Sequence, residues 1–131
     1  MTSTQILEFA SSTDPAGTAV LHVRGEVDLA TAEQLRERLL AEFARHRRLV
    51  VDLSHAMLYD GAALGALRAL HREAVRAGRD TPALRGVRPA LAKALKATGL
   101  DAQFPQETPV PFPSLRTLRR RPEPSPMPSA A

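Results

Sequence analysis

The chain has 131 residues, a formal net charge of +4 and no cysteine. The length favours one domain, and the lack of cysteine excludes a disulfide framework, a thiolate metal site and a cysteine nucleophile. The sequence has no run of about 18 apolar residues that would span a bilayer and no secretory signal in its first 15 residues, so we expect a cytoplasmic protein.

The N-terminal part is predicted to form a β-hairpin. Gln5–Phe9 is a weak strand candidate, and Ala19–Val23 is a strand of apolar and β-branched residues. Between them, Thr13–Gly17 has the Asp, Pro and Gly residues that favour a tight turn.

A first helix follows the hairpin. Gly25–Ala30 is predicted as a loop, and Thr31 with Gln34 three residues later fits a capping box at the helix start. The helix is expected to end near residues 45–48, where cations suit the negative end of the helix dipole. Its apolar residues recur every three or four positions and predict one buried stripe: Ala32, Leu35, Leu39 and Phe43.

The next stretch is the most informative in the chain. Leu49–Leu53 is almost continuously apolar, which predicts a strand in the middle of a sheet. Residues 54–59 are predicted as a loop, and Asp60 as the N-cap of a second helix. That helix is expected to end at Gly78. Its predicted buried stripe is Leu64, Leu67, Leu70 and Ala74.

The last elements are a poor strand and a third helix. Pro82 and Gly86 weaken the strand over Thr81–Val87, which predicts an edge position. Pro89 suits the first turn of a helix that ends at Gly99. Its inward residues are predicted to be Leu91 and Leu95, and two later residues are expected to fold back onto the sheet: Leu100 and Phe104.

The predicted order is therefore β-β-α-β-α-β-α. It indicates an α/β fold: a mixed sheet of four to five strands, right-handed crossovers and about three to four helices. The domain is expected to cover residues 4–104. Residues 105–131 hold eight of the 11 prolines and several arginines, which predicts a disordered or polyproline-like tail.

Four short motifs resemble those of STAS domains, a family that includes the bacterial anti-sigma factor antagonists. Residues 25–32 (GEVDLATA) resemble the family's GELDLATA opening, and residues 48–54 (RLVVDLS) resemble its central strand. Residues 59–67 (YDGAALGAL) are similar to its switch segment, and residues 97–101 (ATGLD) to its LTGLD motif. Four motifs in the family's order and spacing make a rather specific signal.

The resemblance implies a binding function with a missing switch. In this family the domain binds an anti-sigma factor, often an ATPase-type serine kinase, and so releases the sigma factor. The kinase phosphorylates the hydroxyl residue directly after the Asp of the switch segment. Here that position is Gly61, followed by Ala62, and neither has a hydroxyl. The resemblance thus implies either constitutive binding or a degenerate domain kept as a scaffold.

The surface predicted to bind the partner combines the Asp28–Thr31 loop, the Asp60–Ala63 turn and the exposed side of the second helix. Arg68 and Arg72 are expected to supply charge complementarity at its rim, although a solvated basic face is the commoner explanation of such a row. Asp28 also fits a simple turn former. The predicted contact residues are Asp28, Thr31, Asp60, Gly61, Ala62, Ala63 and Arg68.

Other function classes find less support in the sequence. The four histidines lack metal-ligand spacing, and the chain has neither a phosphate-binding loop nor a G-x-S-x-G elbow, so we expect no enzyme, metal or cofactor. The basic residues lack the motifs of sequence-specific nucleic-acid binding. The alternative is a small-ligand sensor or a scaffold STAS domain in a signalling assembly, and a deep apolar pocket near Gly61 would favour the sensor.

Overall fold

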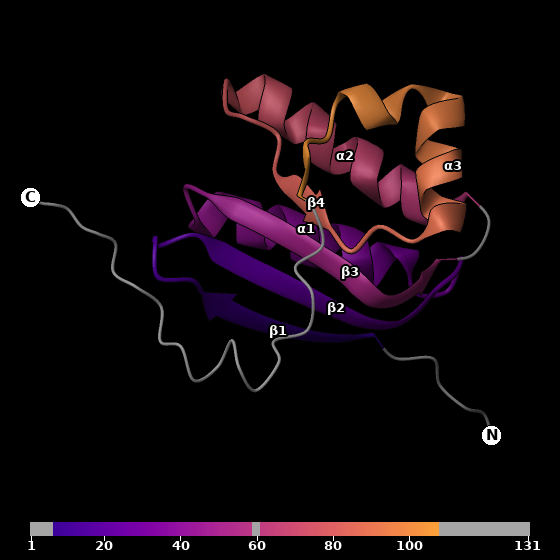
Figure 1. Cartoon of the computed structure of the whole chain (residues 1–131), viewed down its shortest axis with the longest axis horizontal. Coiled ribbons are helices and arrows are strands. Elements are labelled where there is room, and N and C mark those ends of the chain that lie inside the picture. Colours follow the sequence, from indigo (N-terminus) through magenta and orange to yellow (C-terminus); the bar gives the residue numbers. More distant parts are fainter. Residues whose placement is uncertain (1–6, 59–60, 108–131) are drawn as a thin grey trace, which may run out of the picture.

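The computed structural model describes residues 7–58 and 61–107. In this part of the chain, five strands form one mixed sheet and three α-helices pack against it (Figure 1). The elements are β1 (Glu8–Thr13), β2 (Ala19–Val27), α1 (Ala32–Arg45), β3 (Leu49–Leu58), α2 (Ala62–Ala77), β4 (Ala83–Arg85), α3 (Pro89–Thr98), a 3-10 turn (Leu100–Ala102) and β5 (Gln106–Glu107). The predicted α/β order is confirmed, and β5 is added after α3.

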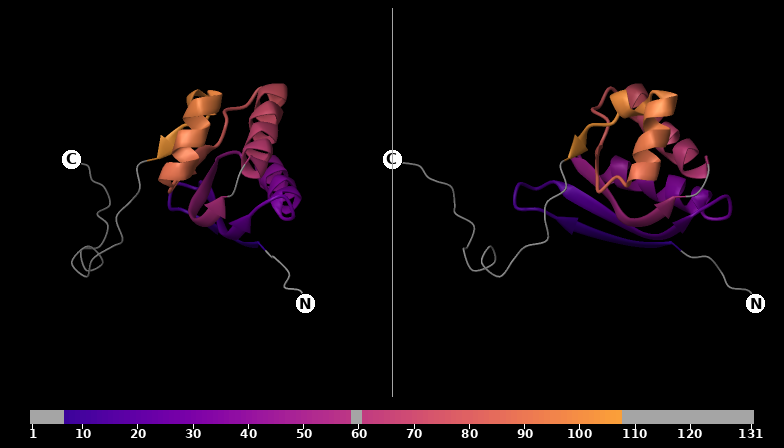
Figure 2. Two further views of the ribbon diagram at one scale, coloured as in Figure 1. Left: turned by 90° about the vertical axis from the view of Figure 1, so that its right-hand side faces the viewer. Right: turned by 45° about the vertical axis from the view of Figure 1, so that its right-hand side comes forward.

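The strands lie side by side in chain order, from β1 to β5. β1 is antiparallel to β2 in a hairpin, and the other neighbouring pairs are parallel. Each parallel connection contains a helix, and the three helices lie together on one face of the sheet (Figure 2). The carboxyl ends of β2 and β3, and the helix starts that follow them, therefore meet at the same edge of the molecule.

The core fills the space between this sheet face and the helices. Leu21 of β2 and Val51 of β3 are fully buried, because alternate residues of each strand face the helices. The α1 stripe is confirmed, with Leu35, Leu39 and Phe43 buried, although Ala32 is only half-buried. On α2 the predicted Leu64 is also half-buried. The residues that α2 buries are Ala63, Ala66, Leu67, Leu70 and Ala74.

Two strands are longer than predicted. β2 continues to Val27 and β3 to Leu58, so most of the two predicted loops is strand. The reason is that the extensions pair with each other: Gly25 lies opposite Ala56, and Val27 lies opposite Leu58. β1 begins three residues later than predicted, at Glu8, because the hairpin register pairs Glu8–Thr13 with β2.

The edge position predicted for β4 is wrong. Gln106 and Glu107 pair in parallel with Leu84 and Arg85, so β4 lies between β3 and β5. The Leu84 N–H donates to the carbonyl of Pro105 at 2.8 Å, which connects this pairing to the chain entering β5.

The predicted helix ends are confirmed. Gly78 and Gly99 follow α2 and α3 in the left-handed conformation, with φ of +67° and +79°. None of the described helices is long and apolar enough to cross a bilayer. Residues 108–131 lie outside the described part of the chain, so the tail stays a prediction.

Candidate protein-binding surface

The loop between β2 and α1 is held by local hydrogen bonds. The carboxylate Oδ1 of Asp28 accepts from the backbone N–H groups of Ala30 (2.9 Å) and Thr31 (3.1 Å). The Thr31 hydroxyl donates to the carbonyl of Glu26 (2.7 Å) and accepts from the N–H of Asp28 (3.0 Å). Thr31 is the N-cap residue of α1, but its side chain makes no cap bond. The predicted capping box with Gln34 is therefore wrong, because the hydroxyl is used within the loop.

This network assigns different positions to the predicted loop residues. Asp28 forms the turn and stays partly accessible, whereas the Thr31 side chain is buried. Burial removes Thr31 from the accessible surface, so it positions the loop rather than meeting a partner directly. The sequence reasoning missed Leu29, which is 83% exposed beside Asp28. A signal existed, since Leu29 is a large apolar residue outside the periodic stripe that begins at Ala32.

The second corner lies at the start of α2. Gly61 occupies the N-cap position with φ of −86° and ψ of −1°, and the helix begins at Ala62. Asp60, the predicted N-cap, lies outside the described residues. Gly61 is exposed and Ala62 is half-buried, whereas Ala63 is buried in the core. Like Thr31, Ala63 lies beneath the accessible surface and contacts the core.

Four exposed residues share one face of α2: Gly61, Gly65, Arg68 and Arg72. They follow each other at intervals of four, three and four residues, which places them in one row. We call this row the α2 stripe. A Cβ atom built on Gly61 or Gly65 would meet nothing within 4 Å, so the first two turns of the helix present bare backbone to solvent.

The arginines of this helix differ in their partners. Arg76 pairs with Glu73 at 2.5 Å, and this hydrogen bond raises the pKa of Arg76 and lowers that of Glu73. Arg68 and Arg72 form no ion pair with any residue that the structure describes. The α2 stripe thus ends in two exposed cations that have no ion-pair partner within residues 7–58 and 61–107.

The opposite face of the sheet has charges that pair with each other. Asp52 Oδ2 lies 3.7 Å from His22 Nδ1 and 3.9 Å from Arg85 Nη1. The Nη2 atom of Arg85 in turn donates to Glu107 at 3.0 Å. These residues stand in register on four adjacent strands. Such pairs contribute little stability each.

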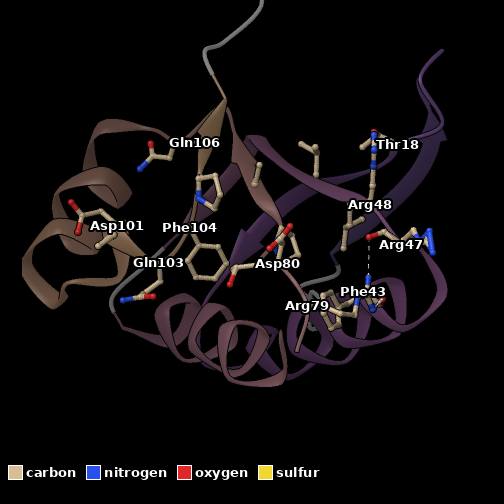
Figure 3. Close-up of a pocket in the computed structure, with 17 residues that line it drawn as sticks. Thr18, Phe43, Arg47, Arg48, Arg79, Asp80, Asp101, Gln103, Phe104 and Gln106 are labelled. Atoms are coloured by element: carbon tan, nitrogen blue, oxygen red, sulfur yellow. Dashed lines mark hydrogen bonds between the residues drawn. The ribbon is translucent and has the colours of Figure 1, made fainter. Parts of the chain in front are cut away.

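A cavity of about 850 Å³ lies at the amino ends of the parallel strands, the edge opposite to the α2 start (Figure 3). Its wall includes Arg47 and Asp80. Arg79, also in the wall, is already engaged: its guanidinium donates to the carbonyls of Phe43 (2.6 Å) and His46 (2.5 Å). It also lies 3.7 Å from the centre of the Phe43 ring.

A second cavity, of about 450 Å³, lies against β1, β2 and β3 and is lined by His22, Arg24 and His55 among others. Neither cavity is lined by Gly61, Ala62 or Ala63. Within residues 7–58 and 61–107, no three histidine, aspartate or glutamate side chains gather as metal ligands would. Both cavities therefore lie away from the start of α2.

Comparison with known proteins adds to this description. The family model described as "Mlab, STAS domain" matches residues 11–110. No curated protein sequence matches the chain significantly. A crystal structure of an anti-sigma factor antagonist from Mycobacterium paratuberculosis is 27% identical, with a TM-score of 0.62, and the match covers 92% of this chain and 97% of that chain.

Two further solved structures share the fold. The anti-sigma factor antagonist SpoIIAA in its unphosphorylated form is 16% identical with a TM-score of 0.61, covering 88% of this chain and 100% of that chain. A variant of RsbS from Moorella thermoacetica is 24% identical with a TM-score of 0.57, covering 78% of this chain and 87% of that chain.

Proposed function

The chain belongs to the STAS domain family, and we propose that it acts as an anti-sigma factor antagonist, a protein–protein interaction module that binds an anti-sigma factor. The proposed contact region, which we call the docking surface, consists of the β2–α1 loop at Asp28 and Leu29 together with the α2 stripe. Ala62 lies within it, and Asp60, which precedes it, stays a predicted contact.

The observation that carries this proposal is the availability of the α2 stripe. Gly61 and Gly65 allow close approach of another backbone, and Arg68 and Arg72 lack partners among the described residues. Unpaired charges at the rim of an interface steer association and select partners of opposite charge. The similarity to the Mycobacterium paratuberculosis antagonist supports the same reading.

We further propose that Gly61 stands at the family's phosphorylated position and that the chain binds without being switched off there. A phosphoryl group needs a hydroxyl oxygen, and neither Gly61 nor Ala62 has one. A phosphate at this point would add a charge of about −2 where α2 begins. Without the hydroxyl, control of binding must act elsewhere, for example through the amount of the protein.

The test compares wild type with Gly61→Ser and Gly61→Ala, using a purified anti-sigma factor kinase from the same organism and ATP. Both substitutions fit the backbone, because φ at Gly61 is −86° and an added Cβ meets nothing within 4 Å. Wild type and Gly61→Ala should bind and take up no phosphate. Gly61→Ser should take up phosphate and then bind more weakly.

Two results would contradict the proposal. Phosphate on residues 59–63 of the wild-type chain would show that the missing hydroxyl does not prevent the modification. Failure of the wild-type chain to bind any purified anti-sigma factor of its organism would remove the binding function itself. The alternative sensor function gains no support from the cavities, since neither reaches Gly61.

A further inference from the structure

We propose that Leu29 is the apolar anchor of the docking surface, and that the partner presents an apolar pocket bordered by carboxylates. This inference rests on the proposed function and adds the chemistry of the partner. It starts from the exposure of Leu29, which at 83% exceeds that of the two other large exposed apolar residues in the described part of the chain, Val75 (64%) and Met57 (42%).

An isolated exposed leucine is ordinary on a protein surface, but Leu29 lies in a loop that is held by several internal hydrogen bonds. The Asp28 carboxylate accepts from the backbone N–H groups of Ala30 and Thr31. The buried Thr31 hydroxyl links back across the turn to the carbonyl of Glu26 and the N–H of Asp28. The backbone around Leu29 is therefore fixed before any partner arrives. The backbone of a residue held in this way loses little further entropy on binding, which favours affinity.

The position of Leu29 makes it part of one continuous surface with Gly61. β2 and β3 are parallel and pair as far as Val27 and Leu58. Leu29 therefore lies two residues after the end of β2, and Gly61 lies three residues after the end of β3. The helices that begin there, α1 and α2, pack against each other. The β2–α1 loop and the start of α2 thus follow the carboxyl ends of two neighbouring strands at the same edge of the sheet.

The charge of the α2 stripe specifies the rest of the partner. Arg68 lies seven residues after Gly61, which is about 10 Å along a helix, and Arg72 is one turn further. An interface of ordinary size covers about 800 Å² on each side, enough to include the loop and both arginines. A partner that buries Leu29 would therefore place its own surface against two cations that have no ion-pair partner among the described residues, and carboxylates fit that position.

The experiment titrates the full chain and its variants against a purified anti-sigma factor of the same organism. Leu29→Asp should weaken binding by at least about tenfold, as expected for a central apolar anchor, and Leu29→Met should retain most of the affinity. Val75→Asp is the matched control, because it puts the same charge on another exposed apolar position of the chain, near the end of α2. It should bind within about twofold of wild type.

The outcomes separate this inference from the proposed function. If wild type binds and Leu29→Asp binds equally well, the anchor is overturned while the proposed function stands. If wild type does not bind, both the proposed function and the Leu29 anchor are contradicted. If wild type self-associates and Leu29→Asp abolishes only that, a second copy covers the surface and the inference is overturned. Unchanged melting temperatures for all three variants are expected, since both sites are exposed.

Discussion

Replacing Gly86 by alanine should destabilise the protein more than the same change at any other left-handed glycine considered above. Gly86 has φ of +71°, and a Cβ atom there would lie 2.5 Å from the Cβ of Ser54 on β3. The left-handed conformation costs an alanine about 1–2 kcal/mol. The clash adds about 1–3 kcal/mol, as for other overpacked sites. We therefore expect the free energy of unfolding to fall by about 2–5 kcal/mol.

Gly78 provides the matched control. Its φ of +67° is nearly the same, but an added Cβ would meet nothing within 4 Å. Gly78→Ala should therefore show only the conformational cost of about 1–2 kcal/mol. Urea unfolding at constant pH gives both free energies, and the melting temperature should fall by about 4–8 °C per kcal/mol in a domain of this size. Equal destabilisation by the two variants would refute the close approach of the β4–α3 turn to β3.

Three further changes test contacts that hold the domain together. Arg79→Ala should lower the free energy of unfolding, measured in urea, by about 2 kcal/mol, because it removes charge-assisted hydrogen bonds to carbonyls at the end of α1. Arg79→Lys should recover only part of this free energy, because an ammonium group lacks the planar, two-pronged geometry of the guanidinium. Burial opposes ionisation of Glu42, but the hydrogen bond and charge of Arg38 outweigh it and lower the Glu42 pKa. The ionised form thus stabilises the folded state above about pH 4.5, and this contribution is lost as the pH falls through the lowered folded-state pKa. In Glu42→Gln the free energy of unfolding should therefore fall less steeply with decreasing pH than in wild type. Equal pH dependence in the two proteins would contradict the lowered pKa of Glu42. Thr31→Val should cost about 1 kcal/mol by removing two partly buried hydrogen bonds to the backbone of Glu26 and Asp28. A melting temperature equal to that of wild type would show that the loop does not depend on the hydroxyl.

The order of the elements could be predicted because their signals are local. The stripe of Leu35, Leu39 and Phe43 marks a helix by its spacing alone, and the burial of all three agrees. Gly78 and Gly99 end helices because few other residues adopt a positive φ there. The central place of β3 also followed from one local property, its nearly unbroken apolar run over residues 49–53.

The features that escaped prediction depend on residues far away in the chain. The second halves of β2 and β3 have polar residues and a glycine, and they are strands because Gly25 and Ala56 pair with each other. β5 has only two residues, and its strand conformation requires β4 beside it. Both cases show pairing between segments overriding the weak preference of each segment alone.

The candidate surface was predicted unevenly for the same reason. The corner at Gly61 and the exposed Arg68 followed from their places in the sequence motifs. The use of the Thr31 hydroxyl did not, because it depends on the backbone position of Glu26. The spacing of Leu29 outside the α1 stripe hinted at its exposure, but the burial of Thr31 follows only from the course of the loop.

The empty space around Gly61 has an evolutionary consequence. Since the backbone there has a negative φ and no neighbouring atom within reach of a new Cβ, alanine, serine and other small side chains fit equally well. Alanine or serine at this position therefore adds no clash at the Cβ atom. A glycine codon of suitable third base becomes a serine codon by one nucleotide change, so descendants of this protein would gain or lose the hydroxyl without an intermediate that fails to fold.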